Sequence, residues 1–328
     1  MAAGSSYRED IRRSAGMSPE EDAMDRQHND DPHHLASAAV VVGIDGSQAA
    51  DRALMWAAEV ADRRGRELLI VHGLQLDRLA EVYSRYDVTI TPVVEAMHDR
   101  GEVYTGTAVD KVRQRYPALR LSSMVADGDA GSLLVRLSAT AYRVVIGAGE
   151  RPAHMGSILV PVTGHAHGAV AVVRADPDAD DAVRTGGPVV VGIDGGPVGE
   201  PALAVAFEEA AERGAELVAV HVWADANLGQ YADYPYILES VPSIAVEEEA
   251  LLAERLAGWQ EKYPDVAVTR MMYPSDPADV LVDWSKRARL VVVGSRGRGG
   301  FRGLLLGSTS NSLVQHAHCP VMVVRDEA

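Results

Sequence analysis

Val40-Val-Val-Gly-Ile-Asp-Gly46 recurs without change as residues 189–195. Shorter matches follow in the same order along the chain, with Tyr-Pro at 116–117 and 263–264 and Gly-Ser at 156–157 and 307–308. An ordered series of matches at a nearly constant offset is the signature of an internal repeat. The chain therefore contains two copies of one structural unit, which we name the first and the second repeat.

Each repeat alternates short apolar runs with amphipathic stretches. In the first repeat, buried strands are expected where Val, Ile and Leu dominate, at residues 40–44, 68–72, 121–125, 144–146 and 170–173. Helix faces are predicted by apolar residues at i, i+3, i+4 and i+7, as at Leu54, Ala57, Ala58 and Ala61 and again at Leu203, Ala206, Phe207 and Ala210. The alternation predicts α/β architecture: two tandem doubly wound, mostly parallel five-stranded sheets. Ligands of such sheets bind beyond the carboxyl ends of the strands, where the strand order reverses.

The domain boundaries follow from composition. Residues 1–38 contain almost no branched apolar side chains, so we expect a disordered N-terminal tail. The first repeat is assigned to residues 39–175 and the second to residues 188–328. Residues 176–187 are polar and contain Pro177 and Gly186-Gly187, which is typical of a linker.

Charge and composition exclude several classes of protein. The formal net charge of -16 disfavours a nucleic-acid binder, because such proteins present a basic face. Cys319 is the only cysteine, so an intramolecular disulfide is impossible. No apolar run approaches the roughly 20 residues that span a membrane, and no secretory signal is recognisable. We therefore expect a cytoplasmic protein without membrane contact.

A glycine-rich stretch in the second repeat carries the chemistry. Residues 294–309 read Gly-Ser-Arg-Gly-Arg-Gly-Gly-Phe-Arg-Gly-Leu-Leu-Leu-Gly-Ser-Thr, between an expected strand at 290–293 and a helix from about Ser308. Glycines let a backbone approach a phosphate closely, and the amides of a helix N-terminus attract anions. Arg296 and Arg298 add positive charge, and Ser308 and Thr309 add hydroxyl donors.

The residues alone leave a second interpretation open, a flexible loop with a solvated basic face. The two best-known phosphate motifs do not fit. The segment has no Lys for G-x-x-x-x-G-K-[ST], and Arg302 occupies the position of the last glycine of G-x-G-x-x-G.

The spacing does resemble the ATP motif of the universal stress proteins, G-x-x-G followed by nine residues and G-[ST]. Gly294, Gly297, Gly307 and Ser308 match it without a gap. The Val-Gly-Ile-Asp opening of both repeats and the Val-His after the second strand are similar to that family as well. The resemblance covers about residues 39–325 and implies tandem universal stress domains of the adenine nucleotide α-hydrolase-like fold.

The resemblance also implies roles for individual residues. Asp194 would lie near the ribose and phosphates of ATP, with Mg²⁺ as a further ligand, and the backbone of Val222 would contact adenine. From its position alone, Asp194 could instead be a turn former or helix cap. The complete predicted set for cofactor binding is Gly192, Ile193, Asp194, Val222, Val293, Gly294, Arg296, Gly297, Arg298, Gly307, Ser308 and Thr309.

The first repeat departs from this motif. Eight residues separate Gly147 from Gly156, against twelve between Gly294 and Gly307. Four missing residues remove up to about 13 Å of reach. Glu150 replaces the second glycine, and Pro152 removes an amide donor. We therefore expect nucleotide binding to be weak or lost here, although the matching positions persist at Asp45, Gly147, Gly156 and Ser157.

Other polar residues receive structural assignments. His72 and His221 are expected to be satisfied histidines at the end of the second strand of each repeat. The His165-Ala-His167 and His316-Ala-His318 pairs fall at helix ends, where histidine bonds free carbonyls, and this is preferred to a metal site. Residues 247–249 are all Glu and are expected to begin a helix, so they are given no acid–base role.

These features predict a non-enzymatic ATP-binding sensor or switch in the stress response. Two alternatives remain, slow Mg-dependent ATP hydrolysis with Asp194 as metal ligand, and an ATP-independent scaffold that binds partner proteins. The resemblance implies that the repeats dock through their last strands, residues 170–173 and 321–324, within one molecule. A homodimer of two chains is a further expectation.

Overall fold

The computed structural model describes residues 32–76, 91–149, 158–179, 182–196, 199–223, 235–297 and 305–325, with the side chains of residues 235–245 left aside. The expected tail lies mostly outside these ranges. Its last part does not follow the expectation, because residues 32–38 form a turn that packs on the first repeat. His33 is 5% exposed, with Nδ1 at 2.6 Å from Ala141 O, and Arg66 donates to the carbonyls of Leu35 and Ala38.

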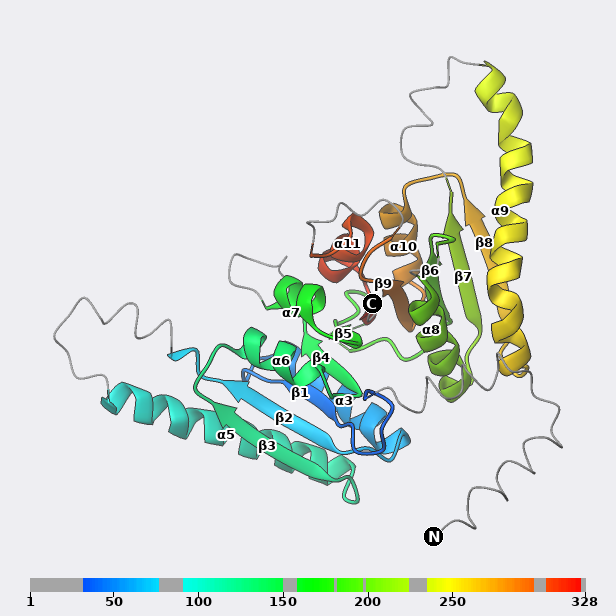
Figure 1. Cartoon of the computed structure of the whole chain (residues 1–328). Helices are drawn as coiled ribbons and strands as arrows, with labels where there is room; N and C mark the ends of the chain where they lie inside the picture. Colours follow the sequence, from blue (N-terminus) through cyan, green and yellow to red (C-terminus); the bar gives the residue numbers. More distant parts are fainter. Residues whose placement is uncertain are drawn as a thin grey trace, which may run out of the picture.

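Ten strands in the described residues form one continuous sheet rather than two separate sheets. Within each repeat all the pairs are parallel, and the strand order is β3-β2-β1-β4-β5 in the first repeat and β8-β7-β6-β9-β10 in the second. The two last strands pair antiparallel, with Val321 opposite Val172 and Val324 opposite Ala169, and this joins the halves (Figure 1). The strands of the first repeat are β1 (Val40–Gly43), β2 (Leu68–Gly73), β3 (Leu121–Ala126), β4 (Arg143–Gly147) and β5 (Ala169–Val173). Those of the second are β6 (Val189–Ile193), β7 (Leu217–Val222), β8 (Val268–Tyr273), β9 (Leu290–Gly294) and β10 (Val321–Val324).

Helices cover both faces of the sheet, so successive strand residues enter two different cores. Val40 and Val42 belong to one core, whereas Val41 belongs to the other. This explains the unbroken apolar runs of the sequence, since a strand buried on both faces has no polar side. The helices of the first core are α3 (Gln48–Arg63), α5 (Thr91–Arg115), α8 (Glu200–Arg213) and α9 (Pro235–Lys262). Those of the second are α6 (Ala130–Ser138), α7 (Leu159–His165), α10 (Pro277–Ser285) and α11 (Ser308–His316).

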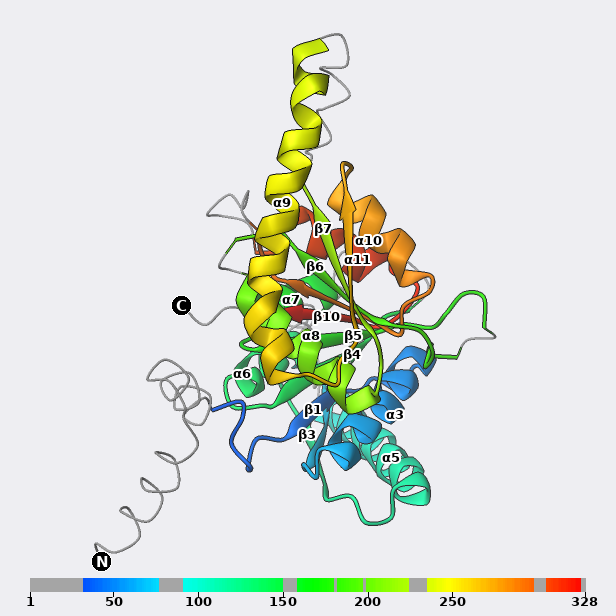
Figure 2. The same ribbon diagram turned by 90° about the vertical axis from the view of Figure 1, so that its right-hand side faces the viewer.

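Residues typical of a helix start mark the beginning of α10. Asp276 caps α10 by accepting from the amides of Ala278 and Asp279, and Pro277 occupies its first turn. The start of α9 is different, since the helix begins at Pro235 instead of Glu247. Figure 2 shows this first part of α9 extending beyond the rest of the domain.

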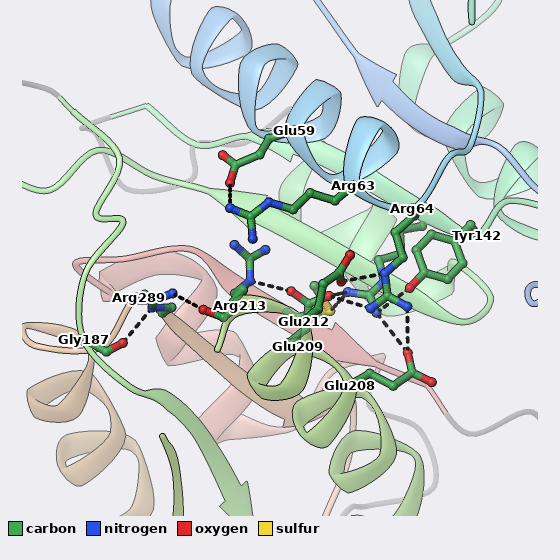
Figure 3. Close-up of polar contacts among 12 residues, drawn as sticks. Glu59, Arg63, Arg64, Tyr142, Gly187, Glu208, Glu209, Glu212, Arg213 and Arg289 are labelled. Atoms are coloured by element: carbon green, nitrogen blue, oxygen red, sulfur yellow. Dashed lines mark hydrogen bonds and ion pairs between the residues drawn. The ribbon is translucent and has the colours of Figure 1, made fainter. Parts of the chain in front are cut away.

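A buried charge network joins the repeats where α3 meets α8 (Figure 3). Arg143 of β4 and Glu209 of α8 form an ion pair, and their side chains are 2% and 1% exposed. Arg213 Nε lies 2.8 Å from Glu209, and Arg64 Nε lies 2.6 Å from Glu212. Burial by itself would raise the pKa of Glu209, but Arg143, Arg213 and Arg64 outweigh it and lower the pKa to about 2. The interface therefore holds a fully ionised carboxylate inside the protein.

Candidate functional site

A pocket of about 400 Å³ opens at the carboxyl ends of β6, β7 and β9 in the second repeat. This is the point where the strand order reverses, as the doubly wound architecture requires. Its lining includes every described member of the predicted set: Gly192, Ile193, Asp194, Val222, Val293, Gly294, Arg296, Gly297, Gly307, Ser308 and Thr309. Arg298 lies outside the described residues.

Asp194 forms the turn that its position predicts, and it also lines the pocket. Its Oδ1 accepts from the amide of Gly196 at 2.8 Å, which makes it the first residue of a tight turn after β6. Its carboxylate also faces the pocket, because a Cβ placed on Gly297 would lie 3.0 Å from Oδ2. Gly297 thus brings the backbone of the glycine-rich stretch against the carboxylate, and a larger residue would crowd it.

The start of α11 has the geometry of an anion-binding helix N-terminus. Gly307 is the N-cap residue and makes no side-chain capping bond, so the first-turn amides beyond it are left available. Two bonds fix this turn against β9. Gly307 N donates to Ser295 O at 2.8 Å, and Ser310 Oγ donates to Gly294 O at 2.6 Å. A helix N-terminus held open in this way, beside Ser308 and Thr309, suits the oxygens of a phosphate.

The pocket lining also contains residues that the sequence did not assign to it, of which His221 and Glu248 are the most informative. His221 is 1% exposed and its Nδ1 lies 2.8 Å from Ile193 O, which confirms the satisfied histidine. Its Nε2 lies 2.7 Å from Glu248 Oε2. A carbonyl oxygen can only accept, so Nδ1 is the donor to Ile193.

The assignment of Glu248 to the first turn of a helix is wrong. The helix begins at Pro235, so Glu248 lies in its middle and faces β7 instead of a helix N-terminus. The pairing joins residues 27 positions apart through the fold, and no local pattern signals it. A comparison of the repeats does show that they differ at this position. When they are aligned at Tyr-Pro, Glu248 of the second repeat corresponds to Gly101 of the first.

The matching edge of the first repeat is built differently. Asp45 Oδ1 accepts from Ser47 N at 2.9 Å, so the turn of Asp194 is kept. At Gly147, however, a Cβ would lie 2.2 Å from Ala49 O, which means that α3 packs directly on this glycine. Gly147 therefore has a packing role that accounts for the residue without a ligand. Glu150, Gly156 and Ser157 lie outside the described residues.

Other candidates have structural roles. His165 Nδ1 lies 2.9 Å from Pro161 O at the end of α7, in keeping with the helix-end assignment. The part of the chain that the structure describes contains no group of three or more His, Cys, Asp or Glu side chains arranged for a metal ion. Cys319 is buried, and burial raises the pKa of its thiol. No described helix is both long and apolar enough to cross a membrane.

Comparisons with known proteins agree with this geometry. The profile of the Universal stress protein family matches residues 38–174 and 187–325. A universal stress protein of Mycobacterium tuberculosis is 37% identical over 299 residues, which is 89% of this chain and 97% of the relative. A second one from that organism is 39% identical over 297 residues, covering 87% and 96%. The crystal structure of a universal stress protein from Archaeoglobus fulgidus has a TM-score of 0.60 at 18% identity, with 88% of this chain and 96% of that chain covered.

Two family matches in tandem, and relatives that align along nearly their whole length, lead to one conclusion. This chain belongs to the universal stress protein family and contains two of its domains.

Proposed function

We propose that the second repeat binds ATP, with Mg²⁺, and that the protein acts as a nucleotide-dependent switch in the stress response of the cytoplasm. The observation that carries the proposal is the convergence of Asp194, Gly297 and the uncapped start of α11 in one pocket. Its volume of about 400 Å³ lies within the roughly 300–1,000 Å³ of small-molecule sites. The phosphates would bind at the amides of α11 and at Arg296, and the adenosine part would lie towards Val222.

A switch needs a ligand that binds one conformation better than another. The glycine-rich stretch contacts the ligand directly, so ATP would favour the arrangement in which residues 294–309 form the phosphate site. The proposal gives no residue a catalytic role. A homodimer of the chain is compatible with it.

The direct test is calorimetric titration of the full chain with ATP and Mg²⁺. We expect one nucleotide per chain, because the motif of the first repeat is shortened. Two nucleotides per chain would contradict this asymmetry, and no binding would refute the proposal.

A substitution tests the phosphate site itself. Gly297→Glu copies Glu150 of the first repeat and places a second carboxylate beside Asp194. The Cβ of the new side chain would lie 3.0 Å from Oδ2 of Asp194. We expect it to abolish ATP binding in the same titration while the circular dichroism spectrum stays unchanged. Gly186→Glu is the matched control, because its Cβ would meet no atom within 4 Å.

One observation supports slow ATP hydrolysis as a second candidate function. The carboxylate of Asp194 lies where it could hold Mg²⁺ near the phosphates. Phosphate release under single-turnover conditions would establish this activity, and none over hours would exclude it.

A further inference from the structure

The first repeat reaches the helix that begins at the phosphate end of the pocket. Arg174 follows β5 of the first repeat and is 9% exposed. Its Nη2 donates to Val314 O in the last turn of α11 at 2.5 Å, and its Nη1 donates to Gly149 O at 3.2 Å. One buried guanidinium thus connects the shortened motif of the first repeat to the helix that starts at Ser308.

The same helix is contacted near its other end. A Cβ placed on Gly164 of α7 would lie 3.0 Å from Cβ of Leu305, which precedes the N-cap Gly307 by two residues. Helices α7 and α11 are in contact and share the second core, where Val162 and Leu313 are both fully buried. Figure 1 shows the two helices side by side near the middle of the molecule. The first repeat therefore supports α11 on both sides of the phosphate-binding turn.

A matching contact runs in the opposite direction. Arg325 follows β10 of the second repeat, and its Nη1 donates to Gly164 O in α7 at 2.5 Å. The antiparallel pairing of β5 with β10 explains both bonds. It places the residue that follows each of these strands beside the segment that leads into the other strand. Arg174 and Arg325 are equivalent in position, but Arg174 bonds α11 directly, whereas Arg325 bonds α7.

We propose that Arg174 is a positioning residue for the phosphate-binding turn of α11, so that the first repeat serves as a support for the nucleotide site of the second. This inference rests on the proposed function. A helix of nine residues is a rigid rod of about 13 Å, so fixing its last turn fixes the direction of its first. The guanidinium also complements the negative end of the helix dipole. Burial lowers the pKa of Arg174, because desolvation disfavours the charged guanidinium.

The inference has a thermodynamic consequence. If docking of the first repeat favours the ATP-binding arrangement of α11, ATP must favour that docking by the same factor. The first repeat would then contribute to ATP affinity without binding nucleotide itself.

The experiment measures the affinity of the full chain for two probes, ATP with Mg²⁺ and adenosine. Arg174→Met is expected to weaken ATP binding about tenfold, a factor typical of coupling between two sites. Adenosine binding is expected to stay within about twofold, because adenosine lacks the phosphates that reach α11. Arg325→Met is the matched control. It removes the equivalent bond across the interface, which ends on α7 instead of α11, and is expected to weaken ATP binding much less than Arg174→Met does.

Arg174→Lys provides a second variant that keeps the charge but offers no fork of donors to two carbonyls. It is expected to weaken ATP binding less than Arg174→Met does, and it keeps the inference testable if Arg174→Met does not fold. ATP affinity unchanged in both Arg174 variants, an equal loss of ATP and adenosine, or an equal effect of Arg325→Met would each overturn the inference. Absence of ATP binding by the unsubstituted chain would instead refute the proposed function, and the inference with it.

Discussion

The carboxyl edges of β1 and β6 begin alike and then diverge. Each ends in Ile-Asp-Gly, each Asp accepts from an amide two residues later, and each following strand places a histidine on the Ile carbonyl at 2.8 Å. The difference lies in the helix that faces the histidine. Gly101 of α5 lies against His72, whose Cδ2 would be 3.0 Å from an added Cβ, whereas Glu248 of α9 bonds His221.

Tyr104 increases this difference. Its ring lies edge-on to His72 at 5.4 Å, and its Cε1 would be 2.8 Å from a Cβ on Gly46. The first repeat thus surrounds its histidine with a glycine and a tyrosine ring, while the second surrounds it with a carboxylate and a pocket. The Asp turn and the bond from His to a carbonyl occur in both repeats, so they belong to the scaffold. Among the described residues, the carboxylate beside the histidine distinguishes the second repeat, and it lines the pocket.

The interface between the repeats shows the same asymmetry. The strand registers make Arg143 equivalent to Leu290, since these residues pair with Val40 and Val189. The helix faces that contain Leu54 and Leu203 make Glu209 equivalent to Val60. One buried ion pair therefore corresponds to one buried apolar pair, and all four residues lie within the interior. The ion pair favours docking of the first repeat against the second. If two first repeats or two second repeats docked in the same way, Arg143 or Glu209 would be buried without its partner.

The largest predicted effect comes from making the interface symmetric. Arg143→Leu leaves Glu209 buried without its main partner and should lower the free energy of unfolding by about 3–5 kcal/mol. Adding Glu209→Val converts the ion pair into a second apolar pair and should recover most of this loss. Urea unfolding of both variants measures the two free energies of unfolding. A double variant as unstable as Arg143→Leu alone would show that the charge pair does not carry the difference.

Acid should act on the same pair with a smaller effect. The pKa of Glu209 is about 2 in the folded protein, against 4.5 as its ordinary value. Its contribution is therefore complete above pH 4.5 and is lost as the pH falls towards 2, amounting to about 3 kcal/mol. Unfolding free energies measured from pH 6 to pH 3 should fall more steeply for the natural chain than for the Arg143→Leu/Glu209→Val variant. Parallel curves would contradict the prediction.

The smallest effect tests the difference between the two histidines. Glu248→Ala leaves Nε2 of the buried His221 without its partner and should cost about 1–2 kcal/mol of stability. Glu249→Ala, at an exposed neighbour on the same helix, should change stability by less than about 0.5 kcal/mol. Thermal unfolding of the two variants makes the comparison, and equal shifts would mean that the Glu248 contact adds nothing.

Much of the site was predictable because its parts are close in sequence. Gly294, Gly297 and Gly307 lie on one short stretch between a strand and a helix, and the repeat of Ile-Asp-Gly marks the adjacent strand end. The doubly wound architecture brings those two elements to the same edge. The His221–Glu248 pair was missed because each residue has a complete local explanation, as a strand-end histidine and as a helix-start carboxylate.

The sequence by itself determined the number of repeats, their strands and the position of the glycine-rich motif, since these depend on local periodicity and on backbone freedom at glycine. The family resemblance implied docking through the last strands, and β5 does pair with β10. Only the tertiary structure decided that Arg143 meets Glu209. It also decided that Arg174 reaches α11. The Arg143–Glu209 contact joins residues 66 positions apart, and the Arg174–Val314 contact joins residues 140 positions apart. The physical reason is that no local propensity specifies which buried charge will meet which partner once two similar domains share a core.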